Sequence, residues 1–311
     1  MTLVPSIAYF GPEGTFTEQA ALTYARPADT LVPVKTVPLA LAAVRAGDTD
    51  LACVPVENSV EGAVSATMDA LAVDEPLVAV AEVVLPVRFS VLVRPGLTAA
   101  DVRTVASHPH ALAQVQDWLA DNLGQAVQAA SNSTAAAAVG VAAGDWDAAV
   151  TAPVAATHYA LDVMATGVAD LDGAVTRFLL LSLPGELPAP TGSDRTSIVA
   201  IAAAERTGVL AEMLTELALR DINLSRIESR PQKGRLGQYR FYLDFDGHVT
   251  EQRVGDALAA LHRRCLQLRF LGSYPKAEPS APPGSVTPGH TDADYLAAAQ
   301  WLSGVLGGTT G

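Results

Sequence analysis

Residues 51–62 read LACVPVENSVEG, a short apolar run followed by a polar loop and a glycine. The run Leu51 to Val56 predicts a buried strand, and the residues after Gly62 predict a helix. Between them, Glu57-Asn58-Ser59 supplies three consecutive hydrogen-bonding side chains, which is more than an Asx turn needs. Ligands of open α/β sheets bind at the carboxyl ends of strands, so this stretch predicts both a fold class and a ligand-binding loop.

The same alternation of apolar strands and alanine-rich helices extends over residues 6–183. Strands are expected at 7–10, 51–56, 89–93, 104–106, 127–130, 147–151 and 178–183, and helices after Gly14, after Gly62, at 109–122 and at 133–143. Such alternation predicts an α/β fold with a mostly parallel sheet.

A second domain is expected after residues 184–193, whose prolines and glycines are typical of a linker. Strands at 196–202, 223–229, 239–245 and 267–271 and helices at 208–220 and 251–263 follow in the order βαββαβ, the ferredoxin-like arrangement. We therefore expect domains at 6–183 and 194–275. The tail, 276–311, is expected to be disordered, with a short helix possible at 295–306.

Composition excludes several classes of function. The net charge is -13, which argues against a nucleic-acid partner or an anionic membrane surface, so an anionic ligand must be held locally. Cys53 and Cys265 are too few for a zinc site or a disulfide framework, so no metal is expected and a reducing compartment fits. No leader or membrane-length apolar run is seen, which predicts a cytoplasmic protein.

A polar pair, Thr176-Arg177, opens the expected strand at 178–183. A hydroxyl and a guanidinium at the edge of a sheet suit an anionic ligand, although a strand start with a solvated arginine has the same pattern. The pair becomes informative only together with the other polar loops of the chain.

Three further loops after expected strands carry small polar residues. The loop 11–18 suits an anion at a helix N-terminus, or Thr15 or Thr17 simply caps that helix. We interpret 107–110 as hydrogen-bonding rather than nucleophilic, because the spacing identifies no base for Ser107. Ser133-Thr134 begins a helix, where capping and carboxylate binding both remain open.

Taken in order, these motifs resemble prephenate dehydratase, a family of phenylalanine biosynthesis. The resemblance is carried by Gly11-Pro12-Glu13-Gly14-Thr15-Phe16, Pro55 to Gly62, Ser107-His108-Pro109 with Gln114, Ser133-Thr134 and Thr176-Arg177-Phe178. Residues 208–210 and 223–231 resemble the ligand-binding motifs of the ACT regulatory domain that follows in this family. The resemblance covers about residues 6–275, and no chorismate-mutase-like segment precedes it, which suggests the monofunctional form.

The resemblance implies a two-lobed, periplasmic-binding-protein-like dehydratase domain with prephenate in the cleft and no cofactor. It implies loss of CO2 and the ring hydroxyl to give phenylpyruvate, with Thr176 and Arg177 as catalytic residues. Arg177 either anchors the substrate or braces the loops. Implied substrate-binding residues are Thr15, Glu57, Asn58, Ser59, Ser107, His108, Gln114, Ser133, Thr134 and Phe178, the last of which also suits the core. One position departs from the family, because Ala174 stands where many relatives carry asparagine.

For the ACT domain the resemblance implies regulation by L-phenylalanine and pairing into a homodimer or homotetramer. The implied effector-binding residues are Gly208, Val209, Leu210, Asn223, Leu224, Glu228, Ser229 and Arg230, with Val209 where alanine is common. Two alternatives remain open. One is an arogenate dehydratase, and the other is a non-catalytic amino-acid sensor.

Overall fold

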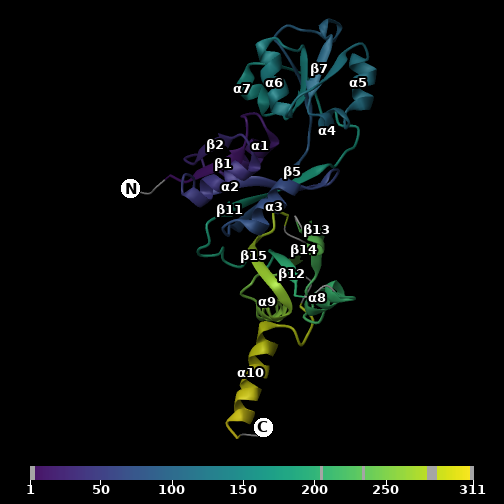
Figure 1. Cartoon of the computed structure of the whole chain (residues 1–311). Helices are drawn as coiled ribbons and strands as arrows, with labels where there is room; N and C mark the ends of the chain where they lie inside the picture. The colour runs from purple at the N-terminus through teal and green to yellow at the C-terminus, as the bar shows by residue number, and fades with distance from the viewer. Residues whose placement is uncertain (1–3, 204–205, 233–234, 279–285, 309–311) are drawn as a thin grey trace. The chain divides into compact units, whose positions relative to one another are not determined.

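The computed structural model describes residues 4–203, 206–232, 235–278 and 286–308 (Figure 1). The chain forms two compact units. Unit 1 comprises residues 1–75 and 83–183, and unit 2 comprises residues 76–82 and 184–311.

The first lobe of unit 1 is built on a sheet with strand order β2-β1-β3-β11-β5, and β4 pairs with β3. Its strands are β1 (Ser6–Phe10), β2 (Thr30–Val34), β3 (Leu51–Asn58), β4 (Gly62–Ala63), β5 (Val78–Pro86) and β11 (Val175–Ser182). Its helices are α1 (Phe16–Tyr24), α2 (Val37–Ala46) and α3 (Ser65–Val73). Strand β1 is parallel to β2 and β3, whereas β11 is antiparallel to β3. The start of β11 therefore lies beside the end of β3.

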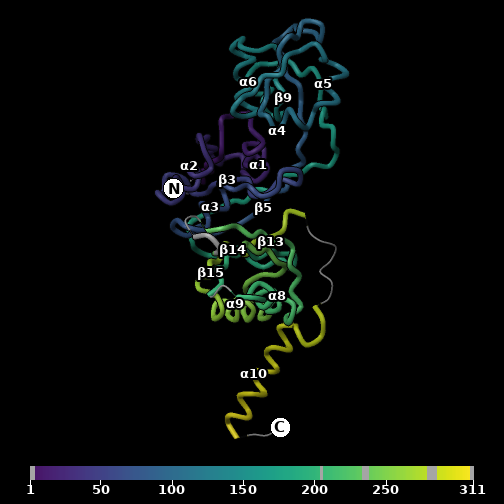
Figure 2. The backbone as a smooth tube through the Cα atoms, turned by 45° about the vertical axis from the view of Figure 1, so that its right-hand side comes forward, coloured from purple at the N-terminus to yellow at the C-terminus, as the bar shows by residue number. Residues whose placement is uncertain are grey.

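The second lobe is built on a sheet with strand order β10-β6-β9-β7-β8. Its strands are β6 (Ser90–Val93), β7 (Thr104–Ser107), β8 (Val127–Ala130), β9 (Ala148–Thr151) and β10 (Asp162–Thr166). A 3-10 helix (Ala99–Asp101) precedes β7, and the α-helices are α4 (Pro109–Leu112), α5 (Gln116–Leu123), α6 (Thr134–Ala143) and α7 (Ala155–Tyr159). Helices α5 and α6 lie on opposite sides of β7 in Figure 1 and of the neighbouring strand β9 in Figure 2. Both faces of the sheet are thereby covered.

The structure differs from the sequence prediction in three respects. The sheets of unit 1 are mixed rather than mostly parallel, because the chain crosses to the second lobe after β5 and returns in β11. The helix expected at 109–122 is two helices, α4 and α5. Strands β2, β5 and β10 and helices α2 and α7 were not predicted. Strand β2 is short, half-exposed and interrupted by Pro33, which argues against a central strand.

Unit 2 contains a four-stranded antiparallel sheet with strand order β13-β14-β12-β15. Its elements are β12 (Asp194–Ala202), α8 (Val209–Ala218), β13 (Leu224–Gln232), β14 (Arg235–Asp246), α9 (Gln252–Arg264) and β15 (Cys265–Pro275), which confirms the predicted βαββαβ order. Helices α8 and α9 lie side by side (Figures 1 and 2). Their apolar faces meet the sheet in a core that includes Ile198, Leu217, Leu243 and Leu261.

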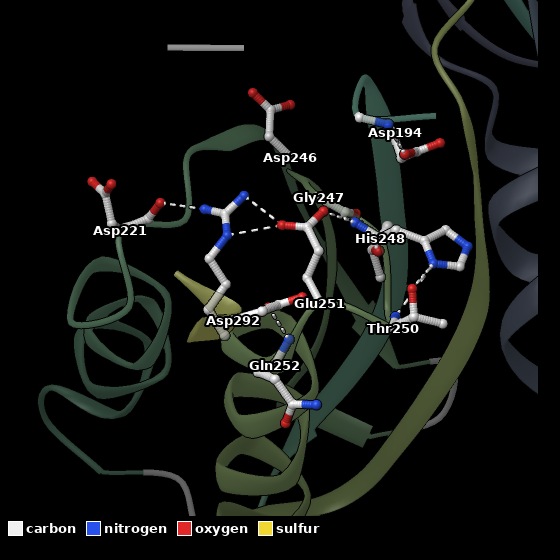
Figure 3. Close-up of polar contacts among 12 residues, drawn as sticks. Asp194, Asp221, Asp246, Gly247, His248, Thr250, Glu251, Gln252 and Asp292 are labelled. Atoms are coloured by element: carbon white, nitrogen blue, oxygen red, sulfur yellow. Dashed lines mark hydrogen bonds and ion pairs between the residues drawn. The ribbon is translucent and has the colours of Figure 1, made fainter. Parts of the chain in front are cut away.

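The first turn of α9 is fixed by a polar network (Figure 3). Glu251 accepts the backbone N–H of His248 at 2.6 Å and pairs with Arg253 at 2.8 Å. The Gln252 N–H donates to Asp292 at 2.8 Å, which ties the start of α10 (Asp292–Leu306) to α9. Part of the tail expected to be disordered, 279–285, lies outside the described residues.

Candidate active site

The hydroxyl of Thr176 is held by Asn58 across two neighbouring strands. Thr176 lies opposite Asn58 in the β3–β11 pairing, and the Asn58 amide Nδ2 donates to Thr176 Oγ1 at 2.8 Å. The Asn58 Oδ1 accepts the backbone N–H groups of Val60 (2.8 Å) and Glu61 (3.0 Å), which fixes the orientation of the amide. Because Oγ1 receives a hydrogen bond, the hydroxyl hydrogen of Thr176 is directed elsewhere and can be donated to a ligand.

Two further contacts hold the ends of these strands together. Arg177 lies opposite Glu57, and its Nε is 3.6 Å from Glu57 Oε2. Ser59 donates its backbone N–H to the Val175 carbonyl at 2.9 Å and accepts the Val175 N–H on its hydroxyl at 3.0 Å. The end of β3 and the loop that follows it are therefore attached to β11 on both sides of Thr176, which itself is only 8% exposed.

The residues that flank this cluster are in the core. Phe178 is 1% exposed and is among the largest fully buried side chains. Ala174, the position at which the sequence departs from the asparagine of the family resemblance, is buried in the core of the second lobe with Val87 and Phe89, and its carbonyl accepts the Val87 N–H at 2.8 Å. This position holds an apolar contact, which a larger amide side chain does not fit without rearrangement.

A second group of polar residues lies around α4. Ser107 is fully buried, and its hydroxyl donates to the Val150 carbonyl at 2.6 Å. His108 caps α4, and burial, followed by the neighbouring His110, lowers its pKa. Gln114 Nε2 lies 3.5 Å from Glu61 Oε1, on the turn that Asn58 closes. Glu61 therefore connects the residues after α4 to Asn58 and Thr176.

A cavity of about 600 Å³ lies at the carboxyl ends of β1 and β2, with both lobes in its walls. It is lined by Phe10, Gly11, Pro12, Glu13, Pro33, Val34, Lys35, Asn132, Ser133, Ala136 and Tyr159. Ser133 caps α6 by accepting the Ala136 N–H at 2.9 Å, and Thr134 is the first residue of that helix. Thr15 caps α1, because its hydroxyl accepts the Glu18 N–H at 3.1 Å and donates to the Phe10 carbonyl at 3.1 Å.

The structure thus brings Glu57, Asn58, Ser59, Thr176 and Arg177 together and places Ser133 at the cavity. Sequence reasoning missed Lys35, His158 and Tyr159, which lie after or in elements that were not predicted. Sequence reasoning also assigned no individual role to Glu13 or Glu18. In the structure both carboxylates face His158. A pairing between residues 140 positions apart leaves no signal in a single sequence.

The residues expected to bind an effector lie at two places in unit 2. Gly208, at φ 85°, precedes α8, Val209 is the first residue of the helix, and Leu210 packs against the core. Asn223 Nδ2 donates to Asp246 at 3.1 Å, and Leu224 begins β13, an edge strand. Along β13 the half-buried residues Glu228 and Arg230 alternate with the exposed Ser229.

Within residues 4–203, 206–232, 235–278 and 286–308, no three His, Cys, Asp or Glu side chains come together as metal ligands would. The helices of that same part of the chain include none that is both long and apolar enough to span a membrane.

Known proteins are similar to this chain over most of its length. The family model described as prephenate dehydratase matches residues 7–185. The chain is 60% identical over 303 residues to the prephenate dehydratase of Amycolatopsis methanolica, with 97% of this chain and 98% of the relative covered. It is 51% identical over 295 residues to that of Mycolicibacterium gilvum (strain PYR-GCK), with 90% and 94% covered.

A solved structure is similar over nearly the whole chain. The crystal structure of prephenate dehydratase in complex with L-Phe from Arthrobacter aurescens gives a TM-score of 0.89 at 42% identity, with 97% of this chain and 99% of that chain covered. The similarity therefore includes both units. By sequence, family model and structure, the chain belongs to the prephenate dehydratase family.

Proposed function

We propose that Thr176 is the hydrogen-bond donor to the ring hydroxyl that prephenate loses. The observation that carries this proposal is the hydrogen bond from Asn58 Nδ2 to Thr176 Oγ1, because it leaves the hydroxyl hydrogen of Thr176 available for the substrate. Oriented donors that need no reorganisation are the groups that stabilise charge developing in a transition state.

The chemistry needs such a donor and little else. The bond between the ring and its carboxylate breaks, its electron pair makes the ring aromatic, and CO2 leaves. The C–O bond at the opposite ring position breaks at the same time, and the departing hydroxyl takes up a proton and leaves as water. An alcohol is a weak acid, so Thr176 acts by hydrogen bonding while the proton comes ultimately from solvent. One well-placed donor of this kind is worth about 3 to 4 kcal/mol.

Prephenate carries two carboxylates, and the one on its side chain is retained. We place the substrate between the lobes beside Thr176, with Asn58 and Gln114 as contacts. The lining of the cavity includes Ser133 but neither of these two residues. The Arg177–Glu57 ion pair supports the bracing role for Arg177, since it joins β3 to β11 beside Thr176. The buried contacts of Ser107 and Phe178 likewise support positioning roles.

The test is to offer the purified protein prephenate and arogenate separately and to compare kcat/KM. A higher kcat/KM for prephenate than for arogenate, with phenylpyruvate as the product, supports the proposal. A higher kcat/KM for arogenate would identify arogenate as the substrate and leave the proposed reaction unchanged. Absence of turnover on both, in a folded protein, would favour the amino-acid sensor.

We also propose that L-phenylalanine regulates the enzyme through an ACT domain at 194–275, joined by the linker 184–193 to a dehydratase domain at 6–183. The relative from Arthrobacter aurescens was crystallised with L-Phe, which supports phenylalanine as the effector. The effector site would include the start of α8 and strand β13, and pairing of ACT domains would give a homodimer or homotetramer. Sedimentation with and without phenylalanine measures the assembly.

We predict that Leu210→Asp reduces phenylalanine inhibition more than it reduces basal turnover. Leu210 is half-buried in the first turn of α8, so a carboxylate there disturbs the effector site while the dehydratase residues of unit 1 are unchanged. Calorimetry measures the phenylalanine affinity, and circular dichroism verifies folding. The matched control is Leu219→Asp, because Leu219 is the C-cap residue of the same helix and is 64% exposed. Unchanged affinity in Leu210→Asp would remove this assignment.

A further inference from the structure

Helix α7 of the second lobe contacts the loop 11–15 of the first lobe. The hydroxyl of Tyr159 donates to the Glu13 carbonyl at 2.5 Å. A Cβ atom on Gly14 would lie 3.0 Å from both Ala155 Cβ and Tyr159 Cε2, so loop and helix are in direct contact. His158 of the same helix has its Nε2 3.0 Å from Glu18 Oε1 and its Nδ1 3.9 Å from Glu13 Oε2.

Glu18 is a buried carboxylate that depends on these partners. It is 4% exposed, and its second oxygen, Oε2, accepts the Gly14 N–H at 2.5 Å. Burial and then the nearby Glu18 and Glu13 carboxylates raise the pKa of Tyr9, so its phenol stays protonated and hydrogen-bonds to Glu18. A buried carboxylate that loses a partner is strongly destabilised, because the desolvation cost remains after the interaction has gone. His158 is the partner that comes from the other lobe.

The side chains of His158 and Glu18 do not line the cavity. The two segments that they join, the loop 11–15 and helix α7, both do. Gly11, Pro12 and Glu13 form part of one wall, and Tyr159, next to His158, forms part of another. The pair therefore acts on a ligand in the cavity through the positions of the loop and of α7.

We propose that His158 and Glu18 are a positioning pair for the dehydratase, which joins the two lobes beside the cavity and holds the loop 11–15 in the conformation that binds substrate. This rests on the proposed function in one respect, namely that prephenate binds between the lobes. The pair acts before the chemical step, so its loss changes KM rather than kcat.

The test is a double-mutant cycle. In His158→Leu the buried Glu18 loses its cross-lobe partner, and we expect KM for prephenate to rise about tenfold, equivalent to about 1.4 kcal/mol, with kcat nearly unchanged. Adding Glu18→Gln removes the unpaired charge but keeps an oxygen for the Gly14 N–H, so the double variant should bind prephenate better than His158→Leu alone. His262→Leu is the matched control, because this exposed histidine lies on α9 in unit 2.

A second measurement does not depend on turnover. Amide hydrogen exchange at Gly14 should accelerate in His158→Leu and slow again in the double variant, because the Gly14 N–H is held by Glu18. An unchanged KM in folded His158→Leu, or a KM that Glu18→Gln does not improve, would overturn the positioning role. If the wild type fails to convert prephenate, the proposed function fails, and exchange at Gly14 still decides whether the pair holds the loop.

Discussion

We expect Thr176→Val to lower kcat for prephenate by about 100- to 1,000-fold, the effect of removing one preorganised donor from a transition state. Valine keeps the β-branched shape that β11 accommodates but has no hydroxyl, so the loss is chemical rather than structural. Thr176→Ser is the matched control, since it keeps a hydroxyl beside Asn58, and it should retain most of the activity. Steady-state kinetics of phenylpyruvate formation measures both variants, and wild-type turnover by folded Thr176→Val would remove Thr176 from the mechanism.

A companion variant tests the direction of the hydrogen bond that fixes Thr176. In Asn58→Asp the Oδ1 acceptor for the Val60 and Glu61 N–H groups is kept, but the Nδ2 donor becomes a carboxylate oxygen. That oxygen accepts the hydroxyl hydrogen of Thr176, which is then no longer available to the substrate. We expect kcat to fall, and the double variant Asn58→Asp with Thr176→Val to be no slower than Thr176→Val alone. Additive losses would mean that Asn58 acts independently of Thr176.

The sequence was sufficient to predict several strands that are buried and apolar, although β5, which is also apolar and largely buried, was not predicted. Leu51–Val56 and Phe178–Leu183 were both expected as strands, and they form the antiparallel centre of the first lobe. The βαββαβ order of unit 2 was also predicted, because strands with apolar residues alternate there with two amphipathic helices, α8 and α9. Half-exposed elements such as β2 carry no such pattern, since solvent accepts polar and apolar residues alike on that face.

Part of the candidate site could likewise be predicted from the sequence, and part could not. Motif resemblance implied that Glu57, Asn58 and Thr176 belong to one site, and the structure shows that the Asn58 amide donates to the Thr176 hydroxyl. The role of Glu18 could not be predicted, because its cross-lobe partner His158 lies on the other lobe and their contact depends on the tertiary fold. The periodicity of apolar residues along a sequence indicates which face of a helix or strand is buried. It does not indicate which two distant polar residues will pair.

We expect Gly272→Ala to lower the free energy of unfolding of unit 2 by about 3 kcal/mol, combining overpacking with a strained backbone. Gly272 lies on β15 at φ 133°, a conformation that alanine rarely adopts. A Cβ there would lie 2.4 Å from the Ala79 carbonyl oxygen and 2.8 Å from the Ala79 nitrogen. Both obstructing atoms are backbone, so no side-chain rotation relieves the clash, and β15 must separate from residues 76–82.

A matched glycine separates the two causes. Gly192 also has a positive φ, 81°, but a Cβ on it meets no atom within 4 Å, so Gly192→Ala carries the backbone strain without the clash. That variant should lose only about 1 kcal/mol. Hydrogen exchange at the amides of β12 and β15 under increasing denaturant reports the unfolding of unit 2 for each variant. If Gly272→Ala is no less stable than Gly192→Ala, the close approach of β15 to Ala79 does not contribute to stability, and the glycine at 272 serves only the backbone conformation.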